Sequence, residues 1–421
     1  MSRINKYRLL VFSFALMLFS LSYADAFSQQ KIIYVETDGP VNTLEKAVTL
    51  ADSGDVIHIT PGIHPVQKLL IEKSITLQGE EGAVIDIGSE GFGIVVMGEN
   101  INLKGFEIKD SGYGFMEDFA AILIEDSRNV VVDSVRLTNN FFGVYIAKSE
   151  KVTITNNKIF SNAVRQTKSG NGVHIWYSKN VEVHNNTIRG HRDGIYLEFV
   201  ETSLITKNHV EGNIRYGLHF MYSNNCTYID NQFQNNLTGV AVMYSKNVVM
   251  QNNRFLENWG ANRYGLLLKE INDSKVISNE FRKNTVGIYS EASNRIEISS
   301  NQFEENGTAL RMMANGVDSR ITSNNFIANT FEVTTNSRQN PNHYNGNYWS
   351  QYEGYDMDRD GVGDVPYRPV RLFSILAERQ SIALVMMRSM LVDLLDTVER
   401  IIPAMTPKNL IDEEPQMSPI E

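Results

Sequence analysis

The chain repeats one short phrase, a glycine followed by alternating apolar residues. It reads Gly143-Val-Tyr-Ile, Gly172-Val-His-Ile, Gly194-Ile-Tyr-Leu, Gly217-Leu-His-Phe, Gly239-Val-Ala-Val, Gly265-Leu-Leu-Leu and Gly287-Ile-Tyr-Ser. Most steps are 22 or 23 residues, and the longer steps before Gly172 and Gly265 indicate inserted loops at 163–170 and 259–264. A fixed period of this size with period-2 alternation is typical of a solenoid of short strands, because helical repeats need 3.6-residue periodicity and longer units.

We therefore predict an all-β fold, a right-handed parallel β-helix of coils of about 22 residues with three strands and three turns each. The right hand is taken from known β-helices. Residues one and three after the glycine are expected to point inward, and residues two and four outward. An asparagine column keeps the same period and is expected at turns, in the left-handed conformation and hydrogen-bonded from coil to coil. It comprises Asn157, Asn186, Asn208, Asn231, Asn253, Asn279, Asn301 and Asn324.

The ends of the chain predict its organisation. Arg3, Lys6 and Arg8 precede an apolar run at 9–21 and a small-x-small cleavage pattern, which is the layout of a signal peptide. We expect a signal peptide at 1–24 (cleavage after residue 26 fits nearly as well), a β-helix with an N-terminal cap at 25–340, an acidic loop segment at 341–370, and an amphipathic helical tail with a loose C-terminus at 371–421. The stretch Thr43–Ala51, with apolar residues at helical spacing, is the expected cap.

Charge and cysteine usage narrow the functional classes. Loss of the three signal-peptide cations takes the net charge from −10 to −13. An acidic protein of this kind is unsuited to nucleic acid or to anionic membrane surfaces. A single cysteine, Cys226, excludes intramolecular disulfides, so the fold itself must supply the stability.

Several longer phrases resemble the NosD family. They are Asn42-Thr-Leu-Glu-Lys-Ala-Val, His191-Arg-Asp-Gly-Ile-Tyr-Leu-Glu-Phe-Val, Arg215-Tyr-Gly-Leu-His-Phe-Met-Tyr-Ser, Gly239-Val-Ala-Val-Met-Tyr-Ser and the stretch from Asn347 to Pro369. The resemblance implies a periplasmic, non-catalytic accessory protein for copper loading of nitrous oxide reductase. Its implied partners are an ABC transporter permease with a cytoplasmic ATPase, a copper chaperone lipoprotein and the reductase. It also implies membrane association through these partners.

The outward positions of the glycine-led strands hold the candidate copper ligands. His174 and His219 come two residues after their glycines, and Met221 and Met243 come four residues after theirs. Coils stack about 4.8 Å apart, so the two methionines are neighbours, whereas the two histidines lie two coils apart and are not expected to share one ion. Thioether and imidazole suit Cu(I) and would not hold magnesium or calcium. The plain alternative is that these side chains only cover their neighbours.

An acidic motif near the C-terminus predicts a calcium loop. Asp356, Asp358, Asp360 and Asp364 alternate around Gly361, and the backbone carbonyl of Val362 occupies the seventh position. An EF-hand would place a glutamate at the twelfth position, where this chain has Tyr367. Either Asp364 completes the shell, or the site is weak, or the loop is only a turn.

The tail carries an apolar stripe at helical spacing, which predicts a cap for the solenoid, a docking helix for a membrane partner, or both. We expect partner docking through Met386, Met387, Met390, Leu391, Leu394 and Val398.

An enzyme acting on uronic-acid polysaccharide, as a lyase, hydrolase or epimerase, is the rival interpretation. Such chemistry needs convergent carboxylates with a basic residue on adjacent coils. The face offers Asp193, Glu198, Arg192 and Arg215, with Trp176 and Tyr196 as sugar platforms, but no second acid aligns with Glu198 on the next coil.

Overall fold

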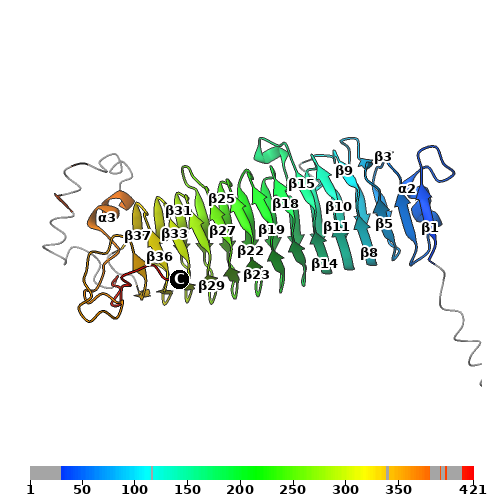
Figure 1. The fold of residues 1–421 in the computed structure, drawn as a ribbon. Coiled ribbons are helices and arrows are strands. Elements are labelled where there is room, and N and C mark those ends of the chain that lie inside the picture. Colours follow the sequence, from blue (N-terminus) through cyan, green and yellow to red (C-terminus); the bar gives the residue numbers. More distant parts are fainter. Residues whose placement is uncertain (1–29, 115–116, 338–340, 380–388, 390–393, 396–409) are drawn as a thin grey trace, which may run out of the picture.

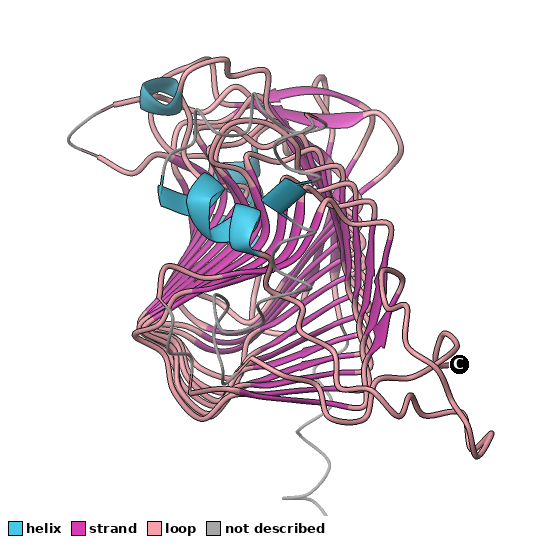
Figure 2. Ribbon diagram, turned by 90° about the vertical axis from the view of Figure 1, so that its left-hand side faces the viewer, coloured by secondary structure: helices cyan, strands magenta, loops and turns pink. Residues whose placement is uncertain are grey.

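The computed structural model describes residues 30–421 except 115–116, 338–340, 380–388, 390–393 and 396–409. The chain winds as a parallel β-solenoid of about 14 turns, consistent with the right-handed parallel β-helix that the repeat predicts. Figure 1 shows the coils side by side along one axis, and Figure 2 looks along that axis from the C-terminal end, where the strands of successive coils superimpose. The expected signal peptide lies outside the described residues. Within them, no helix has the length and apolar character needed to cross a bilayer.

Each coil contributes one strand to each of three parallel sheets, which we call A, B and C. Sheet A contains β1 (Ile32–Val35), β2 (Val56–Ile59), β5 (Thr76–Gly79), β8 (Glu99–Lys104), β11 (Arg128–Asp133), β14 (Glu150–Thr155), β17 (Glu182–His184), β20 (Leu204–Thr206), β23 (Thr227–Ile229), β26 (Val249–Gln251), β29 (Lys275–Ile277), β32 (Glu297–Ser299), β35 (Arg320–Thr322) and β38 (His343–Asn345). Sheet B contains β3 (Gly62–Pro65), β6 (Ala83–Asp86), β9 (Glu107–Lys109), β12 (Arg136–Thr138), β15 (Lys158–Phe160), β18 (Thr187–Arg189), β21 (His209–Glu211), β24 (Gln232–Gln234), β27 (Arg254–Leu256), β30 (Glu280–Arg282), β33 (Gln302–Glu304), β36 (Asn325–Ile327) and β39 (Tyr348–Trp349).

Sheet C consists of the glycine-led strands. It contains β4 (Leu69–Ile71), β7 (Ile94–Val96), β10 (Ala120–Glu125), β13 (Phe142–Ala147), β16 (Val173–Trp176), β19 (Asp193–Glu198), β22 (Tyr216–Met221), β25 (Thr238–Met243), β28 (Tyr264–Lys269), β31 (Val286–Glu291), β34 (Thr308–Met312) and β37 (Phe331–Thr334). A Cβ atom at Gly217 would lie 2.5 Å from the carbonyl oxygen of Gly239 and 3.0 Å from the ring of Phe233. The repeated glycine is therefore required by close approach of the next coil and of the core.

The core fills the interior of the coils as the alternation predicts. Residues one and three after each glycine are buried, as Leu218 and Phe220 illustrate. Sheet B adds a column of parallel rings that runs through Phe233, Phe255, Phe281, Phe303, Phe326 and Trp349. Each fully buried ring contributes about 1.5–3 kcal/mol through removal of apolar surface from water.

The asparagine column forms the predicted hydrogen-bonded ladder. The backbone N–H and Nδ2 of Asn208 both donate to Oδ1 of Asn231 in the next coil, at 3.0 and 2.9 Å, and the pattern continues from Asn157 to Asn347. One detail differs from the expectation. The left-handed conformation belongs to the residue before each ladder asparagine, such as Asn156 at φ +56°, because the ladder side chain itself must turn inward to reach its neighbour.

Both ends of the stack are covered. At the N-terminal end, helix α2 (Leu44–Leu50) begins after the N-cap Thr43 and buries Leu44 and Ala47, as the cap prediction requires. At the other end, α3 (Leu372–Arg379) contacts β37. In Figure 1 the two helices lie at opposite ends of the solenoid.

The segment 410–421 is not loose, in contrast to the expectation from its acidic, proline-punctuated composition. Asp412 and Gln416 form parallel bridges to Tyr344 and Tyr348, so the C-terminus adds to the last coil. The Asp412 carboxylate accepts hydrogen bonds from the N–H of Gly346, the N–H and Nδ2 of Asn347, and Nε1 of Trp349, all at 2.9–3.0 Å. A carboxylate is thus the last acceptor of the asparagine ladder.

We predict that Asp412→Ala lowers the stability of the last coil by about 3 kcal/mol or more, because buried donors then lose their acceptor. Coils of a solenoid contact only their neighbours, so the loss should be local. Hydrogen exchange of the amides in 343–349 measures it. Glu414→Ala is the matched control, because this exposed carboxylate in the same segment accepts a hydrogen bond from Asn345. Equal exchange in the two variants would contradict the prediction.

Candidate functional site

The candidate site lies on the outer face of sheet C, on strands β13 to β25. The residue before each glycine also faces outward, because the glycine and the residue after it both turn to the core. Three outward columns result. One pairs Asp193 with Tyr216, the second runs Tyr145–His174–Tyr196–His219–Ala241, and the third runs Ala147–Trp176–Glu198–Met221–Met243.

The middle column is a buried stack of alternating rings. Ring centroids are 4.5 Å apart for Tyr145 and His174, 4.8 Å for His174 and Tyr196, and 4.7 Å for Tyr196 and His219. His174 is 8% exposed and His219 is 4% exposed. This corrects the expectation of exposed histidines. They do lie on the outer face, but the flanking rings, with Phe142 against His174 and Tyr216 against His219, cover them.

The register brings some candidate copper ligands together and separates one. Met221 and Met243 are direct partners in adjacent strands, as the spacing predicts. Both are half-buried, and His219 lies two residues before Met221 on the same face. The hydroxyl of Tyr196 lies 3.7 Å from Sδ of Met221. His174 is two coils from His219 with the Tyr196 ring between them, so it does not join this group.

A buried carboxylate holds His219. Asp193 is 0% exposed, and its Oδ2 lies 3.5 Å from Nδ1 of His219. Arg215 donates two hydrogen bonds to the same carboxylate, one of them from Nε at 2.8 Å. Both ring nitrogens of His219 are buried and neither makes a hydrogen bond, so Nδ1 faces the carboxylate of Asp193 only in a longer contact. The imidazole thus has one nitrogen facing a carboxylate, and its Nε2 is buried without a partner.

Burial and charge set the protonation of this group. Burial alone would raise the pKa of Asp193, but the hydrogen bonds from Arg215 and the nearby ring of His219 overcome this effect and lower that pKa to about 2. Burial lowers the pKa of His219 below its ordinary value, although Asp193 opposes the effect. Burial also lowers the pKa of His174 to about 3. Both imidazoles are therefore neutral at neutral pH, which is the form that binds metal ions.

Cys226 does not belong to the site. It is completely buried, and burial raises the pKa of its thiol to about 12. A thiol in this state is inert, because the thiolate is the form that ligates metals.

The sequence did not predict that Asp193 and Arg215 would form a group that orients His219. The signal was present, because Asp193 and Tyr216 each precede the repeat glycine and therefore pair in register. Their outward direction depends on the bend at the glycine, which the period alone does not reveal.

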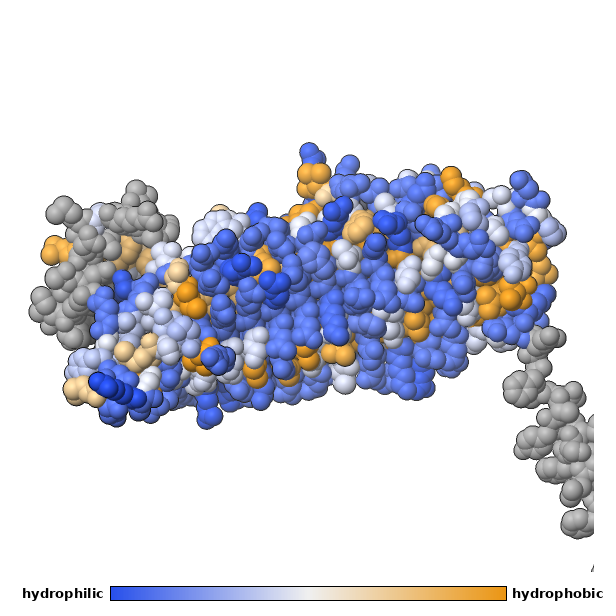
Figure 3. All heavy atoms as spheres, in the orientation of Figure 1, coloured by the Kyte–Doolittle hydropathy of each residue, from blue (hydrophilic) through white to orange (hydrophobic). Residues whose placement is uncertain are grey.

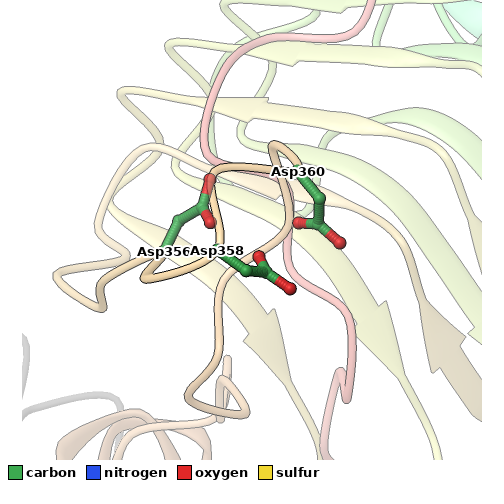
Figure 4. A group of neighbouring side chains, drawn as sticks. All are labelled: Asp356, Asp358 and Asp360. Atoms are coloured by element: carbon green, nitrogen blue, oxygen red, sulfur yellow. The ribbon is translucent and has the colours of Figure 1, made fainter.

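The acidic motif forms a compact exposed loop at the C-terminal end, where carboxylate oxygens of Asp356, Asp358 and Asp360 lie within 4.8 Å of one another. Figure 4 shows the three side chains on this loop. The sixth residue, Gly361, has φ +89°, a conformation that favours glycine. Asp364 accepts a hydrogen bond from the N–H of Met357, and Val362 bridges Gln416 of the C-terminal segment.

The predicted docking residues fall mostly outside the described residues. Met386, Met387, Met390, Leu391 and Val398 lie outside them, whereas Leu394 is described and exposed.

Comparisons with solved structures support the fold alone. The catalytic unit of a GH87 α-1,3-glucanase from Streptomyces thermodiastaticus matches with a TM-score of 0.59 at 13% identity, over 73% of this chain and 62% of that chain. The surface adhesin PfbA of Streptococcus pneumoniae matches with a TM-score of 0.56 at 14% identity, over 69% and 87% of the respective chains.

Sequence comparisons are more specific. Residues 160–354 match the family model of NosD, described as a periplasmic copper-binding protein. Two curated relatives, from Pseudomonas aeruginosa and Stutzerimonas stutzeri, are each described as a probable ABC transporter binding protein NosD. They are 32% and 29% identical to this chain over 111 residues, which is 26% of this chain and 26% of each relative. The aligned segment thus spans about a quarter of the relatives' length. Over these segments the chain is similar to NosD, which is the extent of what the two comparisons show.

Proposed function

We propose that this protein is a periplasmic accessory protein that binds Cu(I) on the outer face of sheet C during maturation of nitrous oxide reductase. The observation that carries the proposal is the buried histidine with a free Nε2 beside two methionines in register. The family description as a periplasmic copper-binding protein supports the same metal. Copper is the cargo here.

His219, Met221 and Met243 are the proposed ligands. Thioether sulfur and imidazole nitrogen are soft and borderline ligands, and they favour Cu(I) over magnesium or calcium. The methionines are half-buried, so an ion bound there would lie at the boundary between solvent and the buried ring stack. Such a position suits a metal that must be received and passed on.

Asp193 is the proposed positioning residue for the copper ligand. Metal-bound histidines commonly direct their second nitrogen at a carboxylate, which fixes the tautomer and the ring orientation. Asp193 is in position to do so for His219, and Arg215 holds Asp193 in turn.

Action with an ABC transporter follows from the relatives' description as transporter binding proteins. The apolar stripe of the tail, from Met386 to Val398, remains our prediction for the docking surface. A copper chaperone lipoprotein and the reductase itself are the other partners that the resemblance implies.

The geometry does not favour the polysaccharide enzyme. The register partners of Glu198 are Trp176 and Met221, so no carboxylate faces it from the adjacent coils. Asp193 is buried and paired with Arg215, which keeps it from reaching a substrate. The relatives' description as binding proteins agrees with a non-catalytic role.

Calcium at the acidic loop is a second, structural proposal. The pKa of Asp358 is raised by the negative charge of Asp360, a repulsion that a cation would relieve. Asp356, Asp358, Asp360, Asp364 and the carbonyl of Val362 are the proposed ligands. The loop also hydrogen-bonds to the C-terminal segment, since the N–H of Gly363 donates to Pro415 and the N–H of Met417 donates to Gly361.

We predict that Met221→Leu with Met243→Leu lowers Cu(I) affinity at least about tenfold, since leucine keeps the volume but removes the sulfur ligand. Competition with a chromophoric Cu(I) chelator measures the affinity. Met97→Leu, an exposed methionine outside the site, is the matched control. In a denitrifying host the double variant should lower the copper content of the reductase at normal protein level. Unchanged affinity and full copper loading would refute the site.

A second prediction concerns Asp193→Asn. The variant should weaken Cu(I) binding about tenfold or more, in line with other carboxylates that orient metal-bound histidines. Because the pKa of Asp193 is depressed, its contribution to stability is present above the unfolded value of about 3.9 and is lost as the pH falls through about 2. The variant should therefore also flatten the acid unfolding curve between these values. Asp273→Asn breaks an exposed pair with Arg295 and should change neither measurement.

A third prediction concerns calcium. Binding to the folded state alone raises the melting temperature with ligand concentration. Calorimetry of the full chain should show a higher melting temperature in calcium than in EGTA, and Asp358→Ala should abolish the difference. Asp230→Ala, which removes an aspartate from a turn far from the loop, should preserve it. A melting temperature indifferent to calcium in the unmodified protein would exclude the site.

A further inference from the structure

A second aromatic column lies beside the methionines, on the exposed turn that follows sheet C. Tyr177, Phe199, Tyr222 and Tyr244 occupy the same position in four consecutive coils. Their rings stack with centroids 4.7, 5.1 and 5.0 Å apart and interplanar angles of 25°, 6° and 16°. The column therefore forms a continuous ridge of stacked rings at the surface, with Tyr177, Phe199 and Tyr222 exposed and Tyr244 half-buried.

Folding does not require aromatic residues at this position. All four residues have positive φ, between +45° and +54°, a conformation that bulky side chains rarely adopt. In the neighbouring coils the equivalent residues are Asp126, Lys148, Glu270 and Ala292, with the same backbone conformation. Since polar or small residues serve the turn equally well there, the aromatic column points to a function at the surface.

The ridge ends at a groove of about 430 Å³ between the turns of four coils. Tyr177 is the terminal ring, and it is 53% exposed. Phe199 covers one of its faces, and Trp176 meets it edge-on at 81°. Nζ of Lys148, the equivalent residue in the preceding coil, lies over the Trp176 ring at 5.7 Å. Tyr177 is thus a half-exposed ring that lines the groove.

The groove is lined by equal numbers of positively and negatively charged side chains. Arg128, Lys148 and Lys179 stand opposite Asp126, Glu150 and Glu201. Nζ of Lys179 lies 3.5 Å from Glu150, and Nζ of Lys148 lies 3.7 Å from Glu125 outside the groove. The groove therefore offers an aromatic face beside hydrogen-bonding groups of both signs, with no excess charge to attract an ion.

We propose that this groove binds an uncharged saccharide, with one pyranose ring stacked on Tyr177. The apolar face of a sugar ring matches an exposed aromatic ring, and its hydroxyls both donate to carboxylates and accept from ammonium and guanidinium groups. The volume lies within the range of small-molecule sites and suits one or two sugar units. The binding is independent of copper, since no groove residue belongs to the proposed copper ligands.

The test is saturation-transfer NMR followed by calorimetry on the full mature chain with cellobiose, maltose, mannobiose and N,N′-diacetylchitobiose. At least one disaccharide should bind with a Kd in the millimolar range or below. Tyr177→Ala should weaken that binding about tenfold, whereas Tyr177→Phe should retain it. Tyr244→Ala is the matched control, because it removes a ring from the far end of the same stack without touching the groove. Circular dichroism checks that each variant is folded.

Several outcomes would overturn the proposal. They are the absence of binding by all four sugars, equal losses in Tyr177→Ala and Tyr244→Ala, and tighter binding of digalacturonate or of tetramethylammonium than of the neutral sugars. Tighter binding of digalacturonate would assign the groove to an anion, and tighter binding of tetramethylammonium would assign it to a cation.

Discussion

Hydrogen bonding from each coil to the next is the constraint on which the rest of the structure depends. Every strand is parallel to its neighbours in the preceding and following coils, and the asparagine ladder adds two further hydrogen bonds for each coil at the turn between sheets A and B. Nothing within this repeating pattern of hydrogen bonds ends the stack of coils. Wherever it stops, strand edges and amide donors are left without partners. Helix α2 covers one end of the stack. At the other end, the carboxylate of Asp412 accepts a hydrogen bond from the last asparagine of the ladder.

Because the interior and the turns carry the stability, the outer face of sheet C is free to vary from coil to coil. The inward residues of β13 to β25 are all aliphatic or aromatic, whereas the outward ones include histidine, methionine, glutamate and tryptophan. The side of the molecule shown in Figure 3 is mostly hydrophilic, with hydrophobic residues in scattered places. The chemistry of this protein is therefore to be sought in outward columns, where a residue meets its equivalent in the next coil.

The sequence predicts much of this architecture and only part of the site. The period and the alternation are enough to predict the solenoid, the core and the ladder, because each depends on contacts that repeat. Register also follows, so the adjacency of Met221 and Met243 could be foreseen. The burial of His219 could not, because it depends on ring packing with Tyr196 and Tyr216 rather than on strand direction. The role of Asp412 could not be predicted either, because its contact with Asn347 joins residues 65 positions apart and is not part of the repeat.

The burial of His219 changes how the proposed copper site should be understood. An exposed histidine and two methionines would form a weak, nonselective surface site. A histidine whose Nδ1 faces a buried carboxylate, and whose pKa is lowered by burial, presents a fixed and deprotonated nitrogen at neutral pH. The methionines, in contrast, remain half-exposed at the rim. One rigid ligand and two adaptable ones provide selectivity from the inner side and access from the outer side, which is the combination that metal transfer between proteins requires.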